Sequence, residues 1–243
     1  MINPLPELHD VEWTGGKIAR FWNQYAALAD RDETYFSKLV GSSLLRVLRR
    51  NGVSLTGRVL DFGCGRGDLL ALIANYGGRY QGVDYSAVSV DAARSRLAGR
   101  AGFAGVQQIE AMPISLPGAH FDVILLIETI EHLLPDQRQE TLREIARLLA
   151  PNGTLVVTVP NEENLALSKV ACPDCGCVFH RMQHVSTWSA ETLAALLAEH
   201  GFQARVCKGT RLAAGGLLGA GVNLARLIAG KARPNLVCIA QKR

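Results

Sequence analysis

Long runs of one residue class are missing from this chain of 243 residues. No stretch of five or more basic residues occurs, so the net charge of +4 forms no track for a polyanion, and we do not expect nucleic acid as a partner. The first residues, MINPLPELHDVEW, have neither a basic start nor a continuous apolar run. They predict no signal peptide, and we expect a cytoplasmic location.

An uninterrupted apolar segment long enough to cross a membrane is also lacking. The longest apolar stretch, residues 212–230, is rich in Gly and Ala and is interrupted by Asn223 and Arg226. A spanning helix needs about 20 mostly apolar residues, so this stretch is a weak candidate. A packed or surface-lying helix is favoured, with peripheral membrane contact through 212–230 as an alternative.

The composition that is present is that of an ordinary globular domain. Hydrophobic residues make up 48% and charged residues 20%. A chain of this length can bury a large core without disulfides. Three of the six cysteines crowd into residues 172–177, and in a reducing compartment such a cluster suggests a metal before it suggests a disulfide.

Hydrophobic periodicity predicts strands that alternate with helices after a helical N-terminal region at 13–50. The predicted strands are 58–62, 80–84, 106–110, 121–127, 154–159, 202–207 and 236–240. The predicted helices between them are 68–76, 87–98, 136–149 and 190–200. This order predicts an α/β fold with a Rossmann-like, seven-stranded, mostly parallel sheet and helices on both faces.

We expect one domain over 1–243 with four parts. They are an N-terminal helical cap (1–54), a core (55–160), a small Cys/His insertion (161–188), and a C-terminal part with the last strands and the apolar helix (189–243). Ligands of such sheets bind at the carboxyl ends of the strands.

A glycine-rich loop follows the first predicted strand of the core. The segment VLDFGCGRG (59–67) contains G-x-G-x-G, whose glycines allow a sharp turn and close approach of a ligand to the backbone. The following helix presents free N–H groups at its start. Asp84 ends the next strand, where its carboxylate can accept hydrogen bonds from both hydroxyls of a ribose. The spacing differs from the G-x-G-x-x-G of dinucleotide folds.

With these residues the chain resembles the class I S-adenosylmethionine (SAM)-dependent methyltransferases, well over residues 55–160 and loosely elsewhere. The resemblance implies that Asp61 orders the loop and that Gly63 and Gly65, with Cys64 and Gly67 of the same loop, lie along the methionine part of SAM. It also implies that Asp84 binds the ribose. By the same resemblance, Tyr85 and Glu110-Ala111-Met112 border the adenine, and Glu128 supports the pocket. Tyr25 either closes the pocket from the N-terminal helix or packs in the core.

The sequence Glu-x-x-Glu-His follows the most apolar strand. On one helical turn, Glu128, Glu131 and His132 would share a face and could bind a divalent ion. Alternatively, His132 is a general base, because the ordinary pKa of histidine is near neutral. The motif is similar to that of small-RNA 3′-end and ubiquinone-pathway O-methyltransferases, which add a downstream His, here His184. We expect His132 and His184, with Glu131, to face the methyl group.

The segment from Cys172 to His180, CPDCGCVFH, has the spacing of a zinc knuckle. Cys172, Cys175, Cys177 and His180 are the candidate ligands of a structural, tetrahedral zinc ion. One helical turn could present His180 and His184 together. The pattern is also similar to bacterial methyltransferases of surface-glycan or natural-product pathways. A redox C-x-x-C is the alternative.

These features predict a SAM-dependent methyltransferase that modifies a hydroxyl of a small-molecule or glycan acceptor. Two alternatives are a metal-dependent RNA ribose 2′-O-methyltransferase and a non-catalytic binding partner with the SAM fold. The intact cofactor loop argues against the second alternative.

Overall fold

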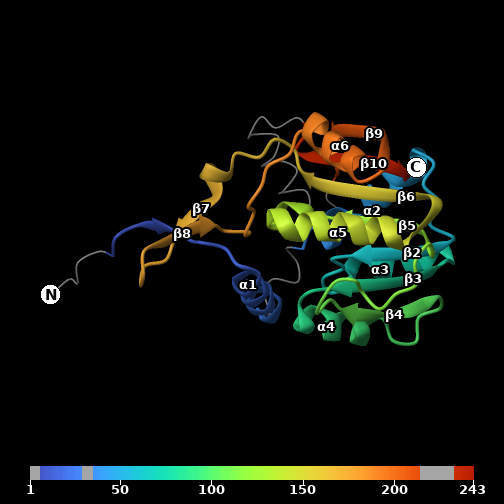
Figure 1. The fold of residues 1–243 in the computed structure, drawn as a ribbon. Coiled ribbons are helices and arrows are strands. Elements are labelled where there is room, and N and C mark those ends of the chain that lie inside the picture. Colours follow the sequence, from blue (N-terminus) through green and yellow to red (C-terminus); the bar gives the residue numbers. More distant parts are fainter. Residues whose placement is uncertain (1–5, 29–34, 214–232) are drawn as a thin grey trace.

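A seven-stranded sheet forms the centre of the computed structural model, which describes residues 6–28, 35–213 and 233–243 (Figure 1). Its strands are β2 (Arg58–Phe62), β3 (Arg79–Asp84), β4 (Phe103–Gln108), β5 (Phe121–Ile127), β6 (Leu149–Pro160), β9 (Phe202–Thr210) and β10 (Asn235–Lys242). They stand in the order β4-β3-β2-β5-β6-β10-β9, and only β10 runs antiparallel to its neighbours. The predicted α/β fold with a mostly parallel sheet is confirmed.

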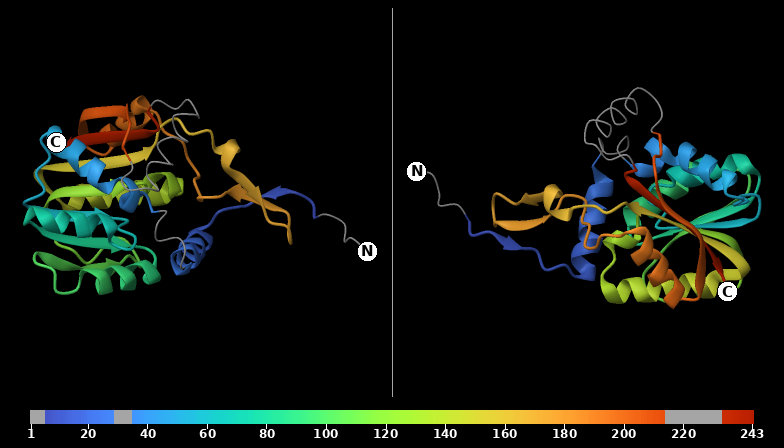
Figure 2. Two further views of the ribbon diagram at one scale, coloured as in Figure 1. Left: turned by 180° about the vertical axis from the view of Figure 1, so that it is seen from behind. Right: turned by 90° about the horizontal axis from the view of Figure 1, so that it is seen from above.

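Helices cover both faces of this sheet (Figure 2). The helices α2 (Phe36–Arg50), α3 (Asp68–Ile73) and α4 (Ala87–Leu97) pack on one face, and α5 (Pro135–Leu148) and α6 (Ala190–Glu199) pack on the other. Side chains alternate between the two faces along each strand. In β5, Val123 and Leu125 join the core under α2 and α3, whereas Ile124 and Leu126 join the core under α5.

Several element boundaries differ from the prediction. Strand β4 begins and ends earlier than 106–110, and β6 already begins at Leu149, because Phe121 pairs with Leu149 across the sheet before the turn at Asn152. The predicted cap at 1–54 divides into two helices with different roles. Helix α2 belongs to the sheet layers, and only α1 (Gly15–Ala27) lies beyond the edge of the sheet.

Helix α1 is attached at three points to segments at the carboxyl edge. Ser86 Oγ donates to Asn23 Oδ1 at 2.7 Å, and Arg66 donates to the Ala26 carbonyl at 3.5 Å. Trp22 Nε1 donates to Gln183 Oε1 at 2.8 Å. These contacts hold α1 beside the residues that follow β2, β3 and β8.

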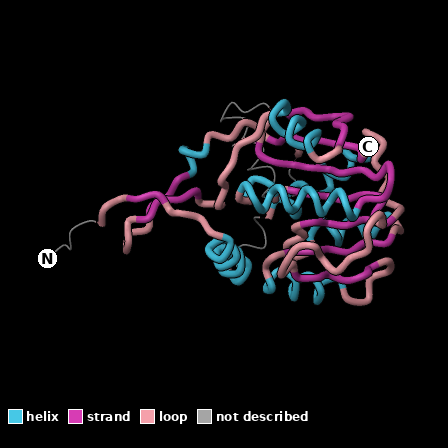
Figure 3. The backbone as a smooth tube through the Cα atoms, in the orientation of Figure 1, coloured by secondary structure: helices cyan, strands magenta, loops and turns pink. Residues whose placement is uncertain are grey.

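The insertion forms a separate three-stranded sheet, β1-β8-β7, that projects from the main sheet (Figure 3). After the short turn η4 (Leu165–Ser168), strand β7 (Lys169–Ala171) pairs antiparallel with β8 (Cys177–His180). The third strand is β1 (His9–Asp10), which comes from the N-terminus and runs parallel to β8. The N-terminal segment and the insertion therefore form one structural unit, which the sequence did not predict.

Most of the apolar stretch 212–230 lies outside the described residues, which include only Leu212 and Ala213 of it. Its predicted helix and membrane contact stay predictions. Among the helices that the structure describes, none combines the length and the apolar character needed to span a bilayer.

Ile124 tests the packing of the α5 face, because its side chain is 0% exposed in the middle of β5. Ile124→Ala should lower the free energy of unfolding by about 2–5 kcal/mol, and Ile124→Val by about 0.5–1.5 kcal/mol, because each deletion leaves a cavity. Chemical denaturation measures both changes. As a control, Val88→Ala on α4 should change the free energy of unfolding by less than about 0.5 kcal/mol, because Val88 is 40% exposed. Equal effects of Ile124→Ala and Val88→Ala would contradict this packing.

Candidate functional site

The glycine-rich loop connects β2 to α3 with three residues in the left-handed region. The φ values are 83° at Gly63, 51° at Gly65 and 78° at Gly67. A Cβ on Gly63 would lie 2.5 Å from Thr129 Oγ1, so this glycine allows the loop to pack against the segment after β5. Among the residues that the structure describes, a Cβ on Gly65 would meet only the ring of Tyr35, at 3.9 Å. The described residues therefore leave the backbone at Gly65 accessible to a close approach by a ligand.

Asp84 connects this loop to the end of β3. Its two carboxylate oxygens accept hydrogen bonds from the backbone N–H groups of Gly65 and Ser86, each at 2.8 Å. The side chain is half-buried, so its remaining lone pairs are available to a ligand. The structure thus brings Asp84 to the loop, as the ribose-binding assignment requires.

Asp61 lies beneath the loop, 2% exposed, and its Oδ1 has no hydrogen-bond partner among the described residues. Burial, with the nearby charge of Asp84, raises the pKa of Asp61 to about 8. A buried, partly unsatisfied carboxylate is suited to a cationic ligand. Cys64 differs, because its thiol is buried against Gly82, where a Cβ would lie 2.6 Å from Sγ. Only the backbone of Cys64 is therefore positioned to contact a ligand.

The predicted adenine side lies after β3 and β4. Gln108 Nε2 donates to the Tyr85 carbonyl at 3.3 Å, and the Ile109 N–H donates to the Asp84 carbonyl at 2.8 Å, so the two strand ends are joined. Tyr85 and Met112 pack against the α5 core. Glu110 and Ala111 are exposed beside them.

On the opposite side of the loop, Glu131, His132 and His184 converge. Each offers a ligand atom, and these atoms lie within 4.8 Å of one another. Glu131 is 1% exposed, and burial, reinforced by Glu128, raises its pKa well above the ordinary value. Burial, with His184, lowers the pKa of His132 to about 3, so this imidazole is neutral at physiological pH. The group can bind a cation or a polar hydrogen, and His132 is a weaker proton acceptor than its ordinary pKa predicts.

Glu128 does not join this group. Strand β5 ends at Ile127, Glu128 takes a left-handed conformation with φ 46°, and a short 3-10 turn, η3 (Ile130–His132), follows. The predicted helical face with Glu128, Glu131 and His132 in a row is wrong, because this segment forms no regular helical turn before Ile130.

His184 also contacts Glu163, a residue that no sequence motif had indicated. His184 Nδ1 hydrogen-bonds to Glu163 Oε2. Since a carboxylate accepts, His184 carries its proton on Nδ1, and the lone pair of Nε2 is available. Glu163 stands just beyond β6, at the carboxyl edge that ligands of parallel sheets use, and this position was the available signal.

The other oxygen of Glu163 lies 3.4 Å from His180 Nε2. His180 Nδ1 accepts from the N–H groups of Met182 and His184, at 3.3 and 3.2 Å, so its proton is on Nε2 and faces Glu163. An imidazole in this tautomer has no lone pair to offer a metal at Nε2. His180 therefore supports Glu163. It ends strand β8 and does not share a helical turn with His184, contrary to the prediction.

Gln183 links this region to α1. Its side chain is 0% exposed, accepts from Trp22 Nε1, and donates to the carbonyl of His132 at 3.0 Å. The Trp22 and His132 rings lie 4.8 Å apart between centroids, as do those of His132 and His184. Tyr25 stacks on Phe21 and contacts Trp22 edge-on, so it belongs to this aromatic surface.

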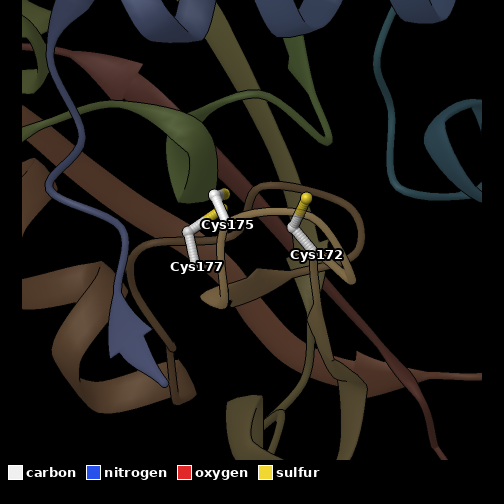
Figure 4. Close-up of side chains that lie close together, drawn as sticks. All are labelled: Cys172, Cys175 and Cys177. Atoms are coloured by element: carbon white, nitrogen blue, oxygen red, sulfur yellow. The ribbon is translucent and has the colours of Figure 1, made fainter. Parts of the chain in front are cut away.

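The three predicted cysteine ligands gather at the tip of the β7–β8 hairpin (Figure 4). The thiols of Cys172, Cys175 and Cys177 lie within 4.8 Å of one another. Hydrogen bonds from Cys177, through its backbone and side chain, lower the pKa of Cys175. His180 is not among them, because successive residues of β8 point to opposite faces and Cys177 and His180 stand at its two ends. The assignment of His180 as the fourth ligand is corrected.

The chain is similar to several known proteins. A family described as "Methyltransferase domain" matches residues 25–205. An O-methyltransferase of Pyrenophora dematioidea is 32% identical over 169 residues, which cover 67% of this chain and 60% of that protein. A ubiquinone biosynthesis O-methyltransferase of a Caulobacter strain is 35% identical over 116 residues, which cover 46% of this chain and 45% of that protein. The chain thus spans about half the length of these relatives.

A solved structure has the same fold at low identity. The 1,6-didemethyltoxoflavin N1-methyltransferase of Burkholderia thailandensis, with bound S-adenosylhomocysteine, superposes with a TM-score of 0.65. The match covers 98% of this chain and 93% of that one at 18% identity. It supports the fold.

The pKa of Asp61 predicts how SAM affinity depends on pH. In the protein without SAM, the Asp61 carboxyl has a pKa of about 8 and is mostly protonated at pH 7. Cationic SAM favours the ionised form of this carboxyl. Binding should therefore release a proton, and affinity should rise with pH by up to about tenfold per pH unit below 8 and level off above it. Calorimetry between pH 6 and 9 measures this slope.

Asp61→Asn is the matched control, because SAM's own groups still titrate in that variant. It should bind SAM more weakly at pH 9 and lose the part of the slope that comes from Asp61. Parallel pH profiles of the two proteins would show that Asp61 does not face the cofactor.

Proposed function

Since the chain belongs to the methyltransferase domain family and has the fold of the class I SAM-dependent enzymes, we propose that it transfers a methyl group from SAM to a hydroxyl of a small-molecule or glycan acceptor. Both curated relatives described above are named O-methyltransferases, which favours oxygen as the acceptor atom. The observation that carries the proposal is the contact between Glu163 and His184 at the carboxyl edge of the sheet.

In this proposal, residues on one side of the Gly63–Gly67 loop bind the methyl donor, and residues on the other side bind the acceptor. The Gly65 backbone, Asp61 and Asp84 hold the donor, with Tyr85 and Met112 on the adenine side. SAM, when bound, supplies an electrophilic methyl group. The acceptor approaches from the side of His132 and His184, where the rings of Trp22 and Tyr25 offer an apolar wall. This wall favours an acceptor with an apolar or aromatic part beside its hydroxyl.

His184 is the general base of this proposal. Nδ1–H is held by Glu163, so the Nε2 lone pair is directed to the acceptor hydroxyl, and the carboxylate stabilises the imidazolium that forms. His132 has a pKa of about 3 and therefore does not retain a proton. Its Nδ1 lies 3.5 Å from the carbonyl of Gln183, which leaves Nε2 to accept a hydrogen bond from the acceptor and orient it.

A second mode is favoured by the convergence of Glu131, His132 and His184 within 4.8 Å. A divalent ion there would neutralise the buried Glu131 carboxylate and bind the acceptor oxygen directly. This mode corresponds to the metal-dependent RNA ribose 2′-O-methyltransferase alternative. Dialysis against a chelator, followed by Mg²⁺ or Mn²⁺, separates the two modes, because only the ion mode loses and regains turnover.

Variants of the base and its partner test the main proposal. His184→Ala should lower turnover by about 10²–10⁴-fold, because it removes general-base catalysis. Glu163→Gln should lower turnover by roughly 10–100-fold, because the imidazole loses the carboxylate that orients it. SAM affinity should stay within about twofold in both, since neither residue contacts the donor side. Turnover is measured as S-adenosylhomocysteine release with a phenolic or sugar acceptor panel.

The pH profile distinguishes a base from a structural residue. In His184→Ala, activity should recover as pH rises toward the pKa of the acceptor hydroxyl, because the acceptor then ionises without help. Loss of stability and SAM affinity together, with no recovery at high pH, would contradict the assignment.

We also propose that the Cys172, Cys175 and Cys177 thiolates hold one structural zinc ion. Three thiols at one hairpin tip suit a tetrahedral Zn²⁺ site, and zinc thiolates need the reduced cysteines that a cytoplasmic location provides.

Elemental analysis of protein purified without chelator should find about one Zn²⁺ per chain. Cys175→Ser should lose most of it, whereas Cys207→Ser, in β9 and outside the cluster, should keep it. Metal-free wild-type protein, or equal zinc in both variants, would refute the site.

A further inference from the structure

The three cysteines at the tip of the β7–β8 hairpin, Cys172, Cys175 and Cys177, are one ligand short of a tetrahedral zinc site. Among the residues that the structure describes, the group within 4.8 Å contains three thiols and no fourth donor. A structural zinc site is closed by four protein ligands. The strand that lies next to Cys177 on the other side from β7 is β1, so the residue opposite Cys177 on β1 is the one to consider.

That residue is His9. In the parallel ladder His9 pairs with Cys177, and the flanking bonds run from the His9 N–H to the Gly176 carbonyl at 3.2 Å and from the Val11 N–H to the Val178 carbonyl at 2.9 Å. Paired residues of neighbouring strands direct their side chains to the same face of a sheet. The exposed His9 ring therefore leaves the sheet beside the Cys177 thiol, on the face of the cluster.

The hydrogen bond of His9 suits a metal ligand. Its Nδ1 lies 3.2 Å from the Glu7 carbonyl, which can only accept, so Nδ1 carries the proton and Nε2 has a free lone pair. Histidines that bind metals commonly donate their other N–H to a backbone carbonyl in this way. His180 has the opposite tautomer and is directed to Glu163. Of the two, only His9 has a nitrogen lone pair that accepts no hydrogen bond from the described part of the protein.

The contact between β1 and the hairpin is closely fitted. Gly176 has φ 76°, and a Cβ there would collide with the Glu7 carbonyl oxygen. On the other side, Lys169 of β7 pairs with Asp10 at 2.6 Å. The N-terminal strand is thus seated directly on the turn that holds the cysteines.

We propose that His9 supplies the fourth ligand of the zinc ion, so that the metal joins the N-terminal strand to the hairpin; this rests on the zinc site proposed above. The backbone of His9 is already in register with Cys177, so we expect a change in the side-chain torsions to bring Nε2 to the thiols. Since β1 leads within five residues to α1, the metal would also limit the positions of the helix that carries Trp22.

Cobalt substitution in the full-length chain tests this ligand. Apo protein is titrated with Co²⁺ and followed by absorption, and Zn²⁺ affinity is measured by competition with a chromophoric chelator. Wild type should show a tetrahedral site with three thiolates and one imidazole. His9→Ala should bind Zn²⁺ on the order of 100-fold more weakly, because one of four ligands is lost. His9→Cys should restore tight binding with four-thiolate charge-transfer bands, and His120→Ala should behave as wild type.

Amide hydrogen exchange provides the structural measurement. Zn²⁺ should slow exchange in residues 9–14 of wild type and of His9→Cys, and leave it unchanged in His9→Ala. If His9→Ala keeps wild-type affinity, cobalt spectrum and zinc-dependent protection, another ligand completes the site and the inference is wrong, while the three-thiolate site stands. If wild type binds no metal, both fail. Neither result bears on methyl transfer, which the His184 variants test.

Discussion

The acceptor side of the site depends on one buried amide, that of Gln183. Its side chain joins Trp22 of α1 to the backbone carbonyl of His132, and its own backbone lies between His180 and His184. With φ 58° it occupies a conformation that costs a non-glycine residue roughly 1–2 kcal/mol. Two hydrogen bonds of the side chain, one buried and one part-buried, offset this cost. Gln183 thereby fixes the distance between the aromatic face of α1 and the two histidines.

Near this amide, the carboxyl edge of the sheet carries several titratable side chains. Burial destabilises the charged form of each. Asp61 and Glu131 have raised pKa values, and His132 has a lowered one, each chiefly because of desolvation. Such groups cost folding free energy in the absence of a ligand. A cationic donor beside Asp61, and an acceptor hydroxyl or an ion beside Glu131, would reduce that cost. The strain and the burial therefore prepare the site for charged and polar ligands.

The N-terminal segment and the insertion are distant in sequence but act as one unit on this edge. Strand β1 completes the sheet of the hairpin, and α1 follows it onto Gln183 and Ser86. The same insertion delivers Glu163, His180 and His184. The hairpin is therefore joined to the acceptor side in two ways, by its hydrogen bonds to β1, which leads into α1, and by the covalent chain after β8.

The sequence alone determined the sheet, its alternating helices and the cofactor loop. Hydrophobic period and glycine position are local properties, and each of the seven strands was predicted with errors only at its ends. It also identified His132, His184 and the three cysteines as chemically special. Only the tertiary structure decided how they combine: it separated His180 from the cysteines, paired Glu163 with His184, removed Glu128 from the cation group and brought β1 to the hairpin. The reason is physical. Residue type and spacing specify what a side chain can do, but tautomer, burial and partner depend on contacts between segments up to about 170 residues apart, and no local pattern encodes those contacts.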